Sequence, residues 1–150
     1  MERVKKLLIL LGSILLVIAL LIVFLYVQIT KPYSEIINMN WSIKLPTSYK
    51  EIYSVDSGAS FHGDGERYHV FEYKNEEDIN LSLNWKNNKN VAIESSTEKV
   101  LNTLNISKEE MPNFESEYKH YTKEKEDDSS KIYLIFFTDT KKLYVIEDIR

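Results

Sequence analysis

An uncharged run of 21 residues, Leu7–Val27, constrains this chain more than any other feature. At 1.5 Å per residue, about 20 apolar residues match the roughly 30 Å hydrocarbon core of a bilayer. A buried soluble helix of the same composition would need apolar partners on every side, and a chain this short does not supply them. We therefore predict a transmembrane helix that contacts the lipid bilayer through Leu7–Val27.

The alternative to an uncleaved anchor is a cleavable signal peptide. Such peptides usually have an apolar region of about 7–15 residues, followed by a cleavage site of the small-x-small type. Here the apolar run is longer, and it continues into the sequence QITKPY (residues 28–33), which has no such site. The sequence favours a signal anchor that stays attached.

Charged residues on the two flanks predict the orientation of this anchor. Arg3, Lys5 and Lys6 precede the apolar run, whereas Lys31 follows it and is opposed by Glu35. The positive-inside rule then places the N-terminus in the cytoplasm and the C-terminal part outside. We expect a single-pass protein of the cell membrane.

The chain divides into four predicted parts: a cytoplasmic tail (1–6), the anchor (7–27), a linker (28–39) and an extracytoplasmic domain (40–150). The absence of cysteine excludes disulfides, thiolate zinc sites and cysteine nucleophiles. A net charge of −4, with no basic patch in the soluble part, argues against nucleic acid as a partner.

Alternation of apolar and polar residues dominates the predicted domain and indicates β-strands. The clearest alternation is Ile79, Leu81, Leu83 and Trp85. The residues between the last two strands, 139–141, suggest a hairpin turn. The strands expected from these patterns are Trp41–Leu45, Ile52–Val55, 61–63 with 66–71, Ile79–Trp85, 117–122, 131–138 and 142–149.

One segment has helical periodicity instead. Ser95 and Glu98 have the spacing of a capping box, in which each side chain bonds to the other residue's backbone N–H. The apolar residues that follow share one face at 3.6-residue spacing, which predicts packing against a sheet; this face comprises Ile93, Thr97, Val100, Leu101 and Leu104. The predicted fold class is α+β: a transmembrane helix, then a mostly antiparallel sheet of about seven strands with one packed helix.

The most distinctive motif is FHGDGERYH, residues 61–69. Asp64-Gly65 favours a two-residue hairpin turn, which requires positive φ. In that register residue 62 pairs with residue 67, so His62, Arg67 and His69 share one face of the hairpin. His62 and His69 become diagonal neighbours across the two strands.

Three interpretations of this hairpin remain open. It is a plain structural turn, a tip that contacts a ligand or partner, or a divalent metal site in which carboxylates join the histidines. A nearby arginine would repel a cation, so we assign no metal and no cofactor. The candidate binding residues are His62, Asp64, Glu66, Arg67 and His69.

The stretch FHGDGE, Phe61 to Glu66, resembles a motif in small, uncharacterised, single-span membrane proteins of low-GC Gram-positive bacteria. This resemblance covers six residues. It implies a membrane location but no activity and no site.

Enzyme motifs such as G-x-S-x-G, H-E-x-x-H and phosphate-binding glycine loops are missing from the sequence. We therefore expect no enzyme and no catalytic residues. The leading hypothesis is a membrane-anchored interaction module that presents a small α+β domain to a partner protein or envelope ligand. The alternatives are a metal- or small-ligand-binding sensor that uses the hairpin at His62–Glu66 and, third, an envelope hydrolase.

Overall fold

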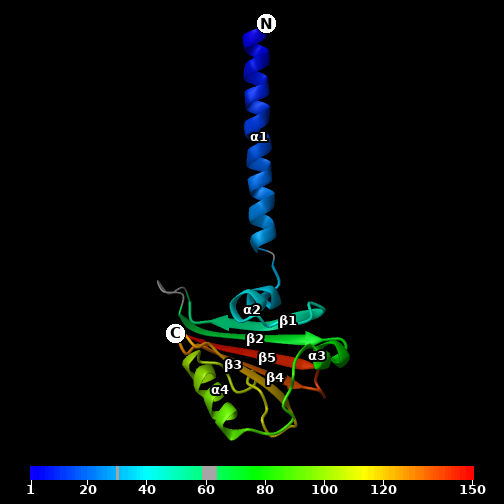
Figure 1. The fold of residues 1–150 in the computed structure, drawn as a ribbon, viewed down its shortest axis with the longest axis vertical. Coiled ribbons are helices and arrows are strands. Elements are labelled where there is room, and N and C mark those ends of the chain that lie inside the picture. The colour runs from blue at the N-terminus through cyan, green and yellow to red at the C-terminus, as the bar shows by residue number, and fades with distance from the viewer. Residues whose placement is uncertain (30, 59–63) are drawn as a thin grey trace.

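The chain folds as an α+β protein in a computed structural model that describes residues 1–29, 31–58 and 64–150. An N-terminal apolar helix precedes an antiparallel sheet with additional helices (Figure 1). The helices are α1 (Glu2–Ile29), α2 (Tyr33–Trp41), α3 (Glu76–Ser82) and α4 (Val91–Thr103). The strands are β1 (Tyr49–Asp56), β2 (Gly65–Tyr73), β3 (Lys119–Glu124), β4 (Lys131–Phe137) and β5 (Lys142–Ile149).

The described residues form a sheet of five strands in the order β1-β2-β5-β4-β3, rather than the seven strands expected. Every neighbouring pair is antiparallel. The predicted C-terminal hairpin is confirmed, with Phe137 opposite Lys142 and Lys141 at a positive φ of 55° in the turn. The C-terminal strand β5 therefore occupies the centre of the sheet, between β2 and β4.

Two predicted strands, Trp41–Leu45 and Ile79–Trp85, are wrong, because each begins inside a helix and continues without forming a strand of the sheet. Trp41 ends α2, and Ile37 and Trp41, four residues apart, are both buried. Ile43 is buried in a segment without regular secondary structure, residues 42–46, that follows α2. In the second region α3 begins with three acidic residues, which favour a helix N-terminus. Ile79 is fully buried and Leu81 is 87% exposed, so these residues do not share a face as a strand requires.

The predicted amphipathic helix is confirmed as α4, but its start and its cap are different. The helix begins at Val91, and the side chain of Asn90 accepts hydrogen bonds from the N–H groups of Ala92 and Ile93. The expected capping residue, Ser95, therefore lies inside the helix. Of the predicted apolar face, Thr97, Val100 and Leu101 are buried, and Ile93 and Leu104 are partly buried.

Both faces of the sheet are covered, and not by a single helix. One face, which we call the α2 face, packs beneath α2 and α3 through Ile37, Trp41 and Ile79. The other, the α4 face, packs beneath α4 through Val100 and Leu101. Double coverage explains why β4 reads KIYLIFF, with little polar alternation.

The first helix lies apart from these two layers (Figure 1). Glu2–Tyr26 is long and apolar enough to cross a membrane, and none of its most apolar window is buried. This helix is consistent with a signal anchor or a signal sequence. Residues 30–32 separate it from α2, so most of the segment expected to be a linker, 28–39, is helix.

Candidate functional site

The connection between β1 and β2 is wider than the predicted two-residue turn. Asp56 pairs with Arg67, and the N–H of Ser57 donates to the carbonyl of Glu66. The expected pairing of residue 62 with residue 67 is therefore wrong. His62, with the rest of 59–63, lies outside the described residues.

Gly65 has the positive φ that the turn prediction required, although the turn itself is wider than two residues. Its φ is 134°, a conformation that L side chains rarely adopt, and an added Cβ would lie 2.1 Å from the Ser57 Oγ. That oxygen accepts a hydrogen bond of 3.0 Å from the N–H of Glu66. Ser57 and Gly65 together thus shape the start of β2.

Alternation along β2 separates the predicted binding residues. Glu66 shares the α4 face with Tyr68, whereas Arg67 and His69 lie on the α2 face. Among the described residues, no group of three or more His, Asp and Glu side chains is placed to hold a metal ion. The predicted set is therefore divided by the sheet.

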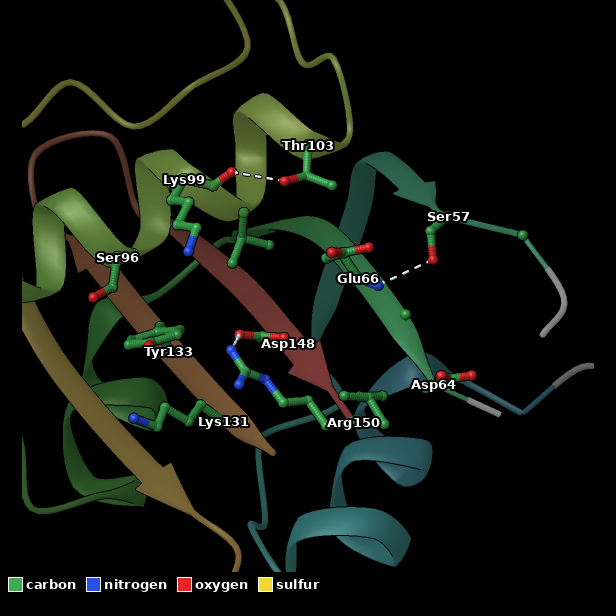
Figure 2. Close-up of a pocket in the computed structure, with 14 residues that line it drawn as sticks. Ser57, Asp64, Glu66, Ser96, Lys99, Thr103, Lys131, Tyr133, Asp148 and Arg150 are labelled. Carbon is green, nitrogen blue, oxygen red and sulfur yellow. Dashed lines mark hydrogen bonds and ion pairs between the residues drawn. The ribbon is translucent and has the colours of Figure 1, made fainter. Parts of the chain in front are cut away.

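Asp64 and Glu66 line a pocket of about 810 Å³ between α4 and one end of the sheet (Figure 2). The buried side chains of Val100 and Tyr133 contribute to its apolar part. The remaining lining residues come from the β1–β2 connection, α4, β4 and the C-terminal end: Ser57, Gly58, Gly65, Ser96, Lys99, Thr103, Lys131, Asp148, Ile149 and Arg150. Such a volume lies in the range of small-ligand sites.

Charges of both signs meet in this pocket, which we call the α4 pocket. Asp148 pairs with Arg150 at 3.3 Å, and Lys131 pairs with Glu124, outside the lining, at 3.3 Å. Lys99 reaches in from α4, and Glu66 rises from β2 (Figure 2). Sequence reasoning found the two acidic residues at the start of β2, but the cations come from elements distant in sequence.

A buried carboxylate, Glu147, organises the opposite face. It is fully buried, and it accepts hydrogen bonds from the Tyr33 hydroxyl and, at 2.5 Å, from the Trp41 Nε1. These two donors stand at opposite ends of α2, and Arg67 is the cross-strand neighbour of Glu147. Sequence reasoning missed this residue. Its signal is that Glu147 continues the alternation of Leu143 and Val145, so a charged residue stands at a position where a buried strand face would carry an apolar one.

His69 packs beside the same cluster. Its ring stacks on Tyr33 with centroids 3.4 Å apart, and its Nδ1 lies 2.8 Å from a carboxylate oxygen of Glu51. Burial lowers the pKa of His69, and this effect outweighs the opposing influence of Glu51 and Glu147. Burial and the nearby Glu147 raise the pKa of the Tyr33 hydroxyl, which therefore stays a donor at neutral pH.

Acid should destabilise the fold through these histidines. Because the pKa of His69 is lower in the folded state, the unfolded chain binds a proton at a higher pH than the folded chain does. The contribution of His69 to the free energy of unfolding is therefore constant above the unfolded pKa of about 6.5 and falls as the pH drops below it. Burial also lowers the pKa of His120, which adds to the same slope. Thermal melting of the full chain in detergent between about pH 7.5 and 5.5 would measure this loss. A His69→Phe variant should show a shallower slope, and an unchanged slope would contradict the assignment to His69.

Comparison with protein-family models, with curated proteins and with solved structures finds no match.

Proposed function

We propose that this chain is a non-catalytic, membrane-anchored interaction module, whose α+β domain lies outside the cell and offers the α4 pocket to a partner protein or envelope ligand. The α4 pocket is the observation that carries the proposal. It gathers charged side chains from four regions of the domain, and α4 lies at the end remote from α1 (Figure 1).

The connection between α1 and the sheet supports this arrangement. Four residue steps, from Ile29 to Tyr33, span on the order of 14 Å at most. Since α2 is bonded to the sheet through Glu147, the domain is held near the end of α1 rather than on a long tether. Arg3, Lys5 and Lys6 favour a cytoplasmic N-terminus.

A small-ligand sensor is the second candidate function. The α4 pocket moves its proposed binding site away from the hairpin tip. The hairpin site expected at His62–Glu66 loses the support of His69, which lies on the α2 face. Asp64 and Glu66 instead line a volume large enough for a small molecule. A ligand would therefore bind beneath α4 rather than between the two histidines.

The absence of cysteine permits a direct test of topology. Single Glu2→Cys and Thr103→Cys variants of the full chain are treated on intact cells with a membrane-impermeant maleimide. We expect labelling at position 103 and, at position 2, labelling only after lysis. The reverse pattern would overturn the proposed orientation.

The same chemistry tests whether the α4 pocket contacts a partner. A photoreactive maleimide is attached to the Thr103→Cys variant or to a matched Asn102→Cys variant, which is exposed on α4 but does not line the pocket. A discrete adduct from position 103 that is absent from position 102 supports a partner at the pocket. Equal adducts from both positions would contradict it.

A further inference from the structure

We propose that the α4 pocket binds a zwitterion, a small molecule with both an ammonium group and an acid group, of which a short peptide with free ends is the representative. This inference rests on the proposed function, since it names the class of ligand that the module would present or sense. It begins with the charges of the pocket.

The charged side chains that line the pocket balance. Three are acidic and three are basic: Asp64, Glu66 and Asp148 against Lys99, Lys131 and Arg150. A lone anion would meet three carboxylates, and a lone cation would meet three basic groups. A ligand that carries both charges can place its ammonium group near a carboxylate and its acid group near a basic side chain.

Ion pairs within the protein involve part of this charge and leave the side chains of Lys99 and Glu66 without a partner among the described residues. The ion pairs Asp148–Arg150 and Lys131–Glu124 already satisfy two of the basic groups. Within the described part of the chain, the Lys99 Nζ and the Glu66 carboxylate make no hydrogen bond or ion pair. They stand on different walls, α4 and β2, with the pocket between them (Figure 2).

The surroundings suit recognition of charged groups. Glu66 is half-buried, and its backbone N–H is bonded to Ser57, which fixes the start of β2. Val100 and Tyr133 are buried and line the same pocket. Charge-assisted hydrogen bonds are stronger than those between neutral groups. In the bound state Lys99 contacts the acid group, and Glu66 contacts the ammonium group.

Trialanine, which has a free amine and a free carboxylate, is the probe. The full chain is placed in phospholipid nanodiscs, with empty nanodiscs as the blank, and binding is followed by isothermal titration. N-acetyl-trialanine lacks the ammonium group, and trialanine amide lacks the carboxylate. We expect each analogue to bind about tenfold more weakly than trialanine, since each loses one charge-assisted contact.

Variants assign each contact to its residue. Glu66→Gln should weaken trialanine about tenfold but leave N-acetyl-trialanine unchanged, because the acetylated probe no longer has a group for Glu66 to bind. Lys99→Gln should weaken trialanine by a similar factor but leave trialanine amide unchanged. Glu98→Gln, exposed on α4 outside the pocket, is the matched control and should bind like the unaltered chain.

Three results would overturn the inference: no binding of trialanine at about 10 mM, equal binding of all three probes, or an equal loss in the Glu98→Gln control. The labelling at positions 2 and 103 and the adduct at 103 are measured independently. If the labelling and the adduct are observed but trialanine does not bind, the zwitterion inference is wrong and the proposed interaction module is still supported. If they also fail, the proposed function fails with it.

Discussion

Replacing Glu147 with alanine is expected to lower the free energy of unfolding by about 3 kcal/mol. The substitution leaves the Tyr33 hydroxyl and the Trp41 Nε1 without their acceptor in a buried setting. It also removes the carboxylate opposite Arg67. A buried donor that loses its partner costs more than the hydrogen bond contributed, because water does not replace the acceptor.

The measurement uses tryptophan fluorescence during chemical unfolding. The chain has two tryptophans, so a Trp85→Phe background leaves Trp41 as the reporter. Glu147→Gln is the matched control, since it keeps the size and one acceptor oxygen, and it should lose less than the alanine variant. A loss below about 1 kcal/mol in Glu147→Ala would mean that α2 is held by apolar packing alone.

The consequence for function concerns the reach of the domain. Because Tyr33 and Trp41 bond to one carboxylate, α2 behaves as part of the sheet rather than as part of a linker. Freeing α2 would lengthen the connection between α1 and the sheet by nine residues. The α4 pocket uses none of these three residues, so a change in reach and a change in ligand binding can be separated.

Strong local patterns predicted several elements of this fold correctly. The uncharged run became α1, and the last two strands became β4 and β5. The apolar face of α4 was also predicted, because five residues at helical spacing leave little choice of period. Its first turn was not, because Asn90 and Ser95 are both acceptable capping residues and sequence alone does not rank them.

Short patterns failed where the tertiary structure decided. Trp41, Ile43 and Leu45 alternate in sequence, yet Trp41 ends a helix, and Ile43 and Leu45 lie in the irregular segment that follows it on the same α2 face. All three are buried, so the apolar residues were identified correctly and only their conformation was wrong. Residue type alone indicates which side chains are buried. The backbone conformation of a short segment also depends on the tertiary contacts that the segment makes.

The candidate site divides in the same way. Turn composition led to Asp64 and Glu66, which do line the α4 pocket. Alternation correctly placed Arg67 and His69 on one face, but not the helix α2 that covers them. The contribution of Lys99 depends on how α4 is packed against the sheet, and no spacing in the sequence carries that information.

A pair of alanine substitutions in α3 tests the largest departure from the sequence prediction. In a strand, Ile79 and Leu81 would lie on one face and their truncation would cost similar amounts. In α3, Ile79 is fully buried among α2-face residues and Leu81 is 87% exposed. Ile79→Ala should therefore lower the free energy of unfolding by about 3 kcal/mol, and Leu81→Ala by less than about 0.5 kcal/mol. Chemical unfolding of the two full-length variants measures the difference. Equal losses would support the predicted strand, since two residues that are two positions apart on a helix do not face the same core.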